Sequence, residues 1–408
     1  MTGSLELKPA RYQVLALHGG RPVREALLPY GHHHLEEPDI QAVMDVLRSE
    51  WLTTGPKLAE FEAAFATFVG ARDAVALSSG TAALHAAAFA AGLGPGDEAI
   101  TTPLTFCATA NCVVYQGARP VFADVCEETL NIDPHDVARR ISPCTKAILP
   151  VDYAGHPADL DALMRLAETH GLVVIEDATH APGAWCEGRR VGSISHMTVF
   201  SFHPVKHLTT GEGGMVTTDH SEFARRLRMF RHHGIDQRPH LRAHHEPWYY
   251  EMTELGYNYR LSDIGCALGL SQLKRLDANL ARRTAIASRY TEAFRGMRGL
   301  RVPTVRPGVR HAWHLYPLRL ELECLSADRA EILRALRAEG LGATVHFIPV
   351  HRHPYYRSRF GYQDGDYPLA EEAYTRLVSL PLFSGMSDQD VQDVIQATTK
   401  VMRCYARS

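Results

Sequence analysis

The chain has 408 residues, more than one compact core usually holds, so its length suggests two domains. Its hydrophobic content of 45% and charged content of 22% are ordinary for a globular protein. The formal net charge of −3 argues against the positive electrostatic field of a nucleic-acid-binding protein and against a polybasic membrane anchor. No apolar run approaches the roughly 20 residues of a membrane span, and residues 1–10 lack a signal-peptide core, so we expect a cytoplasmic protein.

Cysteine and histidine do not form a recognisable metal motif. The eight cysteines are scattered without a Cys-x-x-Cys pair, which predicts reduced thiols rather than a zinc ribbon or a disulfide framework. The run from His32 to His34 is a poor chelate because adjacent side chains diverge. His351 and His353 could share one face of a strand, but no third ligand stands out, so no metal site is expected.

The N-terminal half of the chain alternates between strand and helix patterns. Residues 1–27 lack clear periodicity and are predicted to form an N-terminal extension. Apolar residues at helical spacing predict helices over residues 39–48 and 57–69. Short apolar runs then predict strands at 74–77, 98–101, 119–123, 147–151 and 172–175, with helices after the first and second runs and at 159–170. This alternation predicts an α/β fold whose mostly parallel sheet is covered by helices on both faces.

The C-terminal part has a different pattern. Helices are predicted at 222–233, 261–276 and 279–294, with a polar loop at 234–245. Prolines 303 and 307 mark a plausible domain boundary. Beyond it, strands at 314–322 and 344–348 and helices at 327–339 and 388–402 predict a smaller α+β domain. We therefore expect an extension at 1–27, a large domain at 28–295 and a small domain at 296–408.

One lysine lies between a predicted strand and a glycine-rich turn. The apolar run 197–202 predicts a buried strand, Pro204 stiffens the turn that follows, and Lys206 precedes three glycines within residues 211–214. Lys206 could be an ordinary solvated lysine. It could also form a Schiff base with a carbonyl compound, for which pyridoxal phosphate is a leading candidate.

Three further signals accompany this lysine. The Ser78–Thr81 segment joins a strand to a helix, where it could bind a phosphate or simply cap the helix. Glu176 and Asp177 end another strand, and a carboxylate there could pair with a protonated pyridine nitrogen. Phe106 could stack on a flat ring or belong to the core.

Five motifs in order carry a family resemblance. They are Ser79-Gly-Thr-Ala-Ala-Leu84, Glu176-Asp-Ala-x-His180, Ser201-Phe-His-Pro-Val-Lys206, Thr210-Gly-Glu-Gly-Gly214 and Gly256-Tyr-Asn-Tyr-Arg260. Together they resemble the DegT-type sugar-nucleotide aminotransferases over nearly the whole chain. The resemblance implies the aspartate-aminotransferase architecture, fold type I of pyridoxal-phosphate enzymes, with a smaller C-terminal α+β domain.

The resemblance also implies roles for individual residues. Lys206 would hold the cofactor and act as the catalytic base. Asp177 would pair with the pyridine nitrogen, with Glu176 structural, and Phe106 and His180 would pack on the two faces of the ring. Three residues would hold the phosphate, namely Gly80, Thr81 and Ser201. Asn258 would reach that phosphate from a second subunit, which makes a homodimer necessary for activity.

Three further blocks resemble the members of the family that act in pseudaminic acid biosynthesis. They are Trp51-Leu-Thr-Thr-Gly-Pro56, Glu246-Pro-Trp-Tyr-Tyr-Glu251 and the segment from Val345 to Tyr356. They imply amination of a nucleotide-linked 4-keto-6-deoxy sugar, such as UDP-4-keto-6-deoxy-N-acetyl-hexosamine, with L-glutamate as donor. Three residues could line the sugar-nucleotide pocket, although a structural role is equally open for each, namely Thr53, His346 and His351.

Other functions remain open from the sequence. The enzyme could aminate another nucleotide keto sugar, of the GDP-perosamine, 4-aminoarabinose or C3-amino type. A regulatory protein could keep the fold without turnover, although the intact Lys206, Asp177 and Asn258 argue against this. Some relatives carry histidine in place of the lysine and act as dehydratases, so Lys206 favours transamination. A histidine-rich metalloprotein is the remaining alternative.

Overall fold

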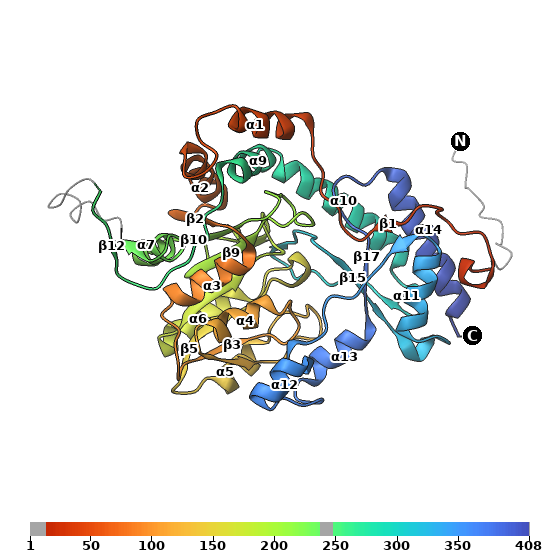
Figure 1. Ribbon diagram of the computed structural model, residues 1–408. Helices are drawn as coiled ribbons and strands as arrows, with labels where there is room; N and C mark the ends of the chain where they lie inside the picture. The colour runs from red at the N-terminus through yellow and green to blue at the C-terminus, as the bar shows by residue number, and fades with distance from the viewer. Residues whose placement is uncertain (1–13, 237–247, 408) are drawn as a thin grey trace.

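A computed structural model of the chain describes residues 14–236 and 248–407 (Figure 1). Part of the predicted N-terminal extension, residues 1–13, lies outside this range. Most of the predicted polar loop at 234–245 and the first residues of the block beginning at Glu246 also lie outside it.

A seven-stranded sheet is the centre of the large part of the molecule. Its strand order is β2-β10-β9-β6-β5-β3-β4, and only β10 runs antiparallel to its neighbours. The bounds are β2 Asp73–Leu77, β3 Glu98–Thr101, β4 Arg119–Phe122, β5 Thr145–Leu149, β6 Val173–Asp177, β9 Met197–Ser201 and β10 Gly214–Thr218. The predicted mostly parallel sheet is therefore confirmed, while β10 was not predicted as a separate strand.

Helices cover both faces of this sheet because alternate strand residues point to opposite sides. In β2, Val75 and Leu77 pack with α3, α4 and α7, whereas Ala74 and Ala76 pack with α2 and α9 on the other face. Helices α5 and α6 extend that second face beside β5 and β6. The bounds are α2 Pro56–Val69, α3 Gly80–Ala90, α4 Ala108–Tyr115, α5 Pro134–Arg140, α6 Leu160–His170, α7 Ser221–Phe230 and α9 Asp263–Leu273. The short α5 was not predicted.

The C-terminal part is built on a small antiparallel sheet of order β13-β15-β17. This sheet shares an apolar core with α10, α11 and α14, which lie together at one end of the molecule in Figure 1. The bounds are α10 Leu276–Phe294, β13 Leu300–Arg301, β15 Tyr316–Leu320, α11 Arg329–Ala338, β16 Leu341–Gly342, α12 Pro354–Phe360, α13 Pro368–Arg376, β17 Leu377–Leu380 and α14 Asp388–Tyr405. The predicted mixture of helices and strands is present; α12, α13 and β17 were not predicted.

The predicted strand at 344–348 is wrong. This segment pairs with a neighbour only through a single bridge between Thr344 and Ser379, because its next residues leave the sheet and turn toward a cavity. The shared strand face for His351 and His353 is wrong for a related reason. His351 belongs to a short 3-10 helix, Val350–Arg352, and His353 precedes α12. No metal-binding cluster occurs in the described ranges.

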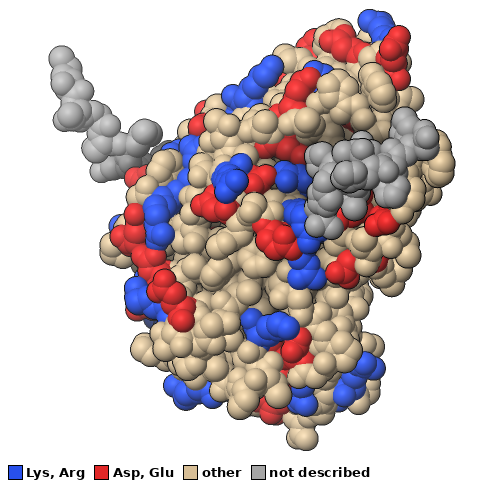
Figure 2. Space-filling view, turned by 90° about the vertical axis from the view of Figure 1, so that its left-hand side faces the viewer, with Lys and Arg blue, Asp and Glu red and all other residues tan. Residues whose placement is uncertain are grey.

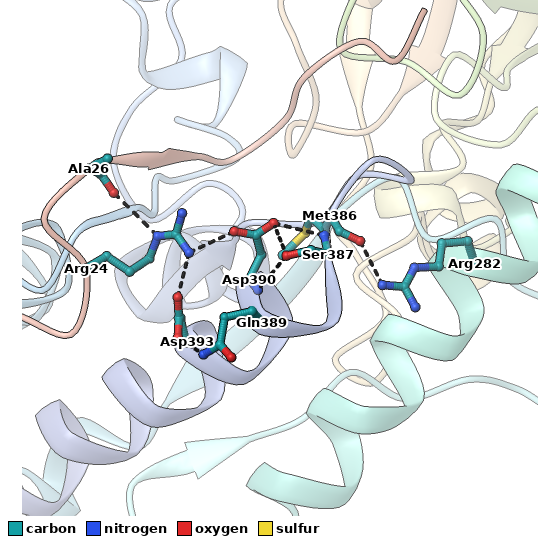
Figure 3. A network of polar contacts seen from close by, with 8 residues as sticks. All are labelled: Arg24, Ala26, Arg282, Met386, Ser387, Gln389, Asp390 and Asp393. Atoms are coloured by element: carbon teal, nitrogen blue, oxygen red, sulfur yellow. Dashed lines mark hydrogen bonds and ion pairs between the residues drawn. The ribbon is translucent and has the colours of Figure 1, made fainter. Parts of the chain in front are cut away.

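Residues 14–27 lie against the C-terminal part of the chain. Strand β1, Leu28–Pro29, pairs in parallel with β16. The buried Glu339 carboxylate accepts hydrogen bonds from the backbone N–H groups of Ala16 and Val23 and pairs with Lys400 at 2.8 Å. Arg24 adds ion pairs to Asp390 and Asp393 in the first turns of α14 (Figure 3). These contacts attach a chain segment to helices that lie more than 300 residues later.

Acidic and basic side chains are interspersed on the face of the molecule shown in Figure 2, and neither sign covers it continuously. This distribution agrees with the formal net charge of −3. Within the part of the chain that the structure describes, no helix has both the length and the hydropathy required to cross a membrane.

The contacts of Glu339 predict a large loss of stability in Glu339→Ala. The substitution leaves Lys400, whose side chain is 6% exposed, without its carboxylate and removes the acceptor of two N–H groups. We expect urea titration to show a loss of about 3–5 kcal/mol in the free energy of unfolding. The matched control is Glu60→Ala in an exposed pair with Lys57, which should cost less than about 1 kcal/mol. Equal losses in both variants would contradict the anchoring role of Glu339.

Candidate active site

The carboxyl ends of the parallel strands open into a cavity of about 350 Å³. Parallel strands place their carboxyl ends at the same edge of a sheet, where ligands of such sheets usually bind. The predicted site residues that line it are Gly80, Thr81, Phe106, Asp177, His180, Ser201, Lys206 and His346. Residues from the loops that follow five different strands therefore meet in one cavity.

The N-terminus of α3 forms one wall of the cavity. Ser79 caps the helix, since its hydroxyl accepts a hydrogen bond from the Ala82 N–H at 3.0 Å. A side chain at Gly80 would place its Cβ 2.8 Å from the Cβ of Ser201, so only glycine allows this close approach. The first-turn N–H groups of a helix have no acceptor within the helix, and here the Ser201 side chain lies beside the first residue of that turn. The segment therefore both caps the helix and provides donors suited to an anion.

Asp177 lies at the end of β6 with only 3% of its surface exposed. Its Oδ2 accepts a hydrogen bond from the Thr109 hydroxyl at 2.7 Å, and its Oδ1 accepts one from the Thr179 N–H at 3.2 Å. Sequence reasoning missed Thr109, which lies on the first turn of α4. The available signal was the spacing of four residues between Thr105, which precedes α4, and Thr109; the two hydroxyls share a hydrogen bond of 2.9 Å.

Lys206 lines the same cavity rather than the outer surface of the protein. The backbone N–H of Lys206 donates a hydrogen bond to the His203 carbonyl at 2.9 Å. The Phe202 carbonyl accepts hydrogen bonds from the Thr210 N–H and the Thr209 hydroxyl, so the turn is held on both sides of the lysine. Burial lowers the pKa of the Lys206 ammonium to about 8; the Asp177 carboxylate opposes this shift, and the Arg283 guanidinium adds to it. The fraction of Lys206 that is a neutral amine near neutral pH is therefore larger than for an ordinary lysine.

Aromatic and imidazole rings surround the mouth of the cavity. Phe106 is 58% exposed, so the alternative that it is a core residue is wrong. Its ring centroid lies 6.1 Å from that of Phe347, whose ring stacks at 5.9 Å on His180. Burial lowers the pKa of His180 well below its usual value, and its Nδ1 is buried without a hydrogen-bond partner in the described part of the chain. The cavity therefore presents flat apolar surfaces and a neutral imidazole.

The structure separates the three candidates for the sugar-nucleotide pocket. His346 lines the cavity and shares a hydrogen bond of 3.0 Å with the Ser379 hydroxyl. His351 does not line it: its side chain is buried and bonds Glu371 at 3.0 Å, so it has a structural contact instead. Thr53 is exposed on the segment before α2 and does not line the cavity of this chain.

Asn258 also lies outside the cavity. It is exposed and forms an isolated backbone bridge with His232. Sequence reasoning missed Tyr30, His314 and Phe347, which all line the cavity. Tyr30 comes from the segment before α1 (Glu37–Leu47), and the centroid of its ring lies 5.1 Å from that of His346. No local pattern distinguishes these residues, because their placement depends on the packing of distant segments.

Comparisons with known proteins agree with this geometry. The model of the DegT/DnrJ/EryC1/StrS aminotransferase family matches residues 33–399. The spore coat polysaccharide biosynthesis protein SpsC of Bacillus subtilis is 47% identical over 382 residues, which are 93% of this chain and 98% of SpsC.

Two solved structures are also similar. Helicobacter pylori PseC, an aminotransferase involved in the biosynthesis of pseudoaminic acid, is 31% identical with a TM-score of 0.86 and covers 93% of this chain and 100% of its own. Spr1654 from Streptococcus pneumoniae, solved in its PLP form, is 30% identical with a TM-score of 0.86 over 93% of this chain and 99% of its own. The chain is thus an aminotransferase for sugars that depends on pyridoxal phosphate, and it belongs to the DegT/DnrJ/EryC1/StrS aminotransferase family.

Proposed function

We propose that the enzyme transfers an amino group from L-glutamate to the ketone of a nucleotide-linked 4-keto-6-deoxy sugar, with UDP-4-keto-6-deoxy-N-acetyl-hexosamine as substrate. The observation that carries the reaction type is Lys206, which lines one cavity with Asp177 and the N-terminus of α3. The similarity to PseC and the blocks of residues 51–56 and 345–356 support the choice of sugar. Amination at C4 yields the corresponding UDP-4-amino-4,6-dideoxy sugar.

The phosphate of the cofactor fits the wall formed by α3. Gly80 and Thr81 offer first-turn N–H groups, and the Ser201 side chain lies so close to Gly80 that a Cβ there would be 2.9 Å from the serine hydroxyl oxygen. A helix N-terminus favours a negative group through both its free donors and its dipole. We assign phosphate binding to these three residues.

The ring of the cofactor fits between the charged and flat groups of the cavity. We assign the pyridine nitrogen to Asp177, whose carboxylate is held by Thr109 and the Thr179 N–H. A buried carboxylate stabilises a positive charge on that nitrogen. Phe106 and His180 offer surfaces for the two faces of the ring.

Lys206 is assigned the proton transfers. When bound, pyridoxal phosphate acts as an electron sink that acidifies the carbon bearing the amino group. The neutral amine of Lys206 removes the proton from the donor carbon, and its ammonium returns a proton to the sugar carbon. A pKa of about 8 suits both directions because neither protonation state is rare near neutral pH. The non-catalytic alternative is not retained, since an enzyme of this family keeps its lysine in the cavity.

The proposed active unit is a homodimer. Asn258 and Thr53 are exposed and do not line the cavity of their own chain, which supports a role for them in the site of a second copy. His346 is the substrate contact that we propose within one chain. The cytoplasmic location and the division at residues 27 and 295 stay predictions from the sequence.

Lys206→Ala should abolish transamination. The loss of the general base and of the covalent attachment point should reduce kcat by at least about 10²–10⁴-fold. Steady-state assay with glutamate and the keto sugar measures turnover, and the absorption spectrum of the purified protein reports the attached cofactor. The control is Lys146→Ala, which removes an exposed lysine paired with Asp97 and should leave both measurements unchanged. Turnover above about one hundredth of the wild-type value in Lys206→Ala would contradict the assignment.

The shifted pKa predicts how Lys206 reacts in cofactor-free protein. Only the neutral amine is nucleophilic, so modification by an acylating reagent should reach half its maximal rate near pH 8. The exposed Lys146, paired with Asp97, is the lysine used for comparison. Mass spectrometry of peptides from samples treated briefly at each pH separates the two residues. Parallel profiles for the two lysines would contradict the effect of burial on Lys206.

The choice of sugar is tested with a substrate panel. UDP-, GDP- and dTDP-linked 4-keto-6-deoxy sugars, with and without an N-acetyl group, are each offered with glutamate. We expect kcat/KM for the UDP-linked N-acetyl sugar to exceed that of every other sugar by at least about tenfold. A site that hydrogen-bonds the correct substrate binds an analogue more weakly when the analogue leaves its buried polar atoms unpaired. Preference for a GDP-linked sugar would support the perosamine alternative instead, and preference for a dTDP-linked sugar would contradict the choice of UDP.

A further inference from the structure

Two buried carboxyl groups lie beside Asp177 on the other side of β6. Asp152 and Glu176 are each 0% exposed. Glu176 precedes Asp177 on the strand, and successive strand side chains point to opposite faces, so Glu176 points away from the cavity. Asp152 follows the end of β5, and its N–H bonds the Asp177 carbonyl at 3.1 Å. The two carboxyl groups therefore belong to the backbone region that positions Asp177.

Each carboxyl group has one satisfied oxygen. Asp152 Oδ1 accepts from the Ala158 N–H at 2.9 Å, and Glu176 Oε2 accepts from the Thr198 hydroxyl at 2.8 Å. The other oxygens, Asp152 Oδ2 and Glu176 Oε1, are buried, and no conventional donor in the described residues bonds them with good geometry. The two carboxyl groups face each other within hydrogen-bonding reach, and the Ser195 hydroxyl faces Glu176 as well. Two ionised carboxylates have no proton with which to form such a contact.

The surroundings do not stabilise two negative charges. Neither carboxyl forms an ion pair within residues 14–236 and 248–407. The titratable and polar groups that face the pair are the Asp177 carboxylate on β6, the Cys186 thiol on the short strand β7 (Trp185–Cys186), the Ser195 hydroxyl before β9 and the Thr198 hydroxyl on β9. Burial and the neighbouring carboxylate raise the pKa of Asp152 well above its ordinary value, and burial raises the pKa of Glu176 as well. A proton is therefore retained in this pair.

We propose that Asp152 and Glu176 share one proton in the folded enzyme and that their acid–carboxylate hydrogen bond positions Asp177. Asp152 donates, and Glu176 accepts. The bond joins the loop after β5 to β6, where Asp177 N–H also bonds the Pro150 carbonyl at 2.8 Å. The retained proton also removes one negative charge from the neighbourhood of Asp177. The effect of the pair on cofactor binding rests on the proposed function, in which Asp177 holds the pyridine nitrogen. The shared proton itself does not rest on that function.

Infrared spectroscopy of the holoenzyme tests the proton directly. At neutral pH the wild type should show the carbonyl stretching band of a protonated, buried carboxylic acid. Glu176→Gln and Asp152→Asn should each lose it, because an amide then donates to the remaining carboxylate. Asp161→Asn is the control: Asp161 is an exposed carboxylate paired with Arg189, and the band should persist. Absence of the band in the wild type, or its persistence in both pair variants, would overturn the shared proton.

The pH dependence of stability gives an independent measurement. In the folded wild type the pair holds a proton that the unfolded chain releases near the ordinary carboxyl pKa values of about 4. Rising pH above that point must therefore destabilise the wild type relative to Glu176→Gln, which carries no such proton. The ratio of the two unfolding constants should change by up to about tenfold per pH unit, until the pair itself ionises. A ratio that does not depend on pH would overturn the proposal.

The positioning role is tested through the cofactor. Glu176→Gln preserves the shape and charge of the pair and should keep the wild-type affinity for pyridoxal phosphate and its absorption spectrum. Glu176→Ala removes the bond and should weaken cofactor binding by at least about tenfold, with an altered pH dependence of the absorption band. Wild-type binding in Glu176→Ala would overturn the positioning role. If Glu176→Ala does not fold, Glu176→Gln provides the test: a loss of cofactor affinity in Glu176→Gln would overturn the positioning role. Neither outcome affects the substrate panel, which tests the proposed function separately.

Discussion

The site depends first on the parallel pairing of β3, β5, β6 and β9. Parallel strands have the same direction, so the residues that follow each of them emerge at one edge of the sheet. Phe106, Asp177 and Ser201 are far apart in sequence and meet only for this reason. The antiparallel β10 begins at the same edge, where Gly214 pairs with Ser201 and Leu77, so the glycine-rich turn before it lies beside the N-terminus of α3. The close approach of Gly80 to Ser201 is a consequence of that arrangement.

The second constraint is the small number of charges in the cavity. Burial lowers the pKa of His180 and His314 well below the usual histidine value and that of His346 to about 4, so these rings are neutral at neutral pH. Asp177, Glu212 and Lys206 are the acidic and basic residues of the lining. Arg283 lies buried on α10, bonded to the carbonyls of Trp313 and Leu382, and adds a positive potential that favours the neutral amine of Lys206. The retained proton of Asp152 and Glu176 fits the same pattern, since it limits negative charge around Asp177.

Sequence periodicity predicted the elements with strong patterns. The strand at 98–101 and the amphipathic α6 agree with the structure within a residue or two. The segment 344–348 shows where this reasoning fails, because an apolar run looks the same whether it joins a sheet or lines a cavity. The short α5, α12 and α13 were missed for the opposite reason, since seven to nine residues hold too few periodic positions to distinguish a helix from a loop.

The chemistry of the site was determined by the sequence alone. A lysine before a glycine-rich turn, a carboxylate at a strand end and a serine–glycine–threonine segment before a helix each left a structural alternative open, and the resemblance of the five ordered motifs to the DegT-type family decided between them. Only the tertiary structure decided which other residues take part. His346 lines the cavity and His351 does not, although both lie in one short segment. Tyr30 and Thr109 reach the site, and Asp152 meets Glu176, through contacts between segments that are distant in sequence. Such contacts arise from the packing of whole elements, and no local pattern of residues encodes them.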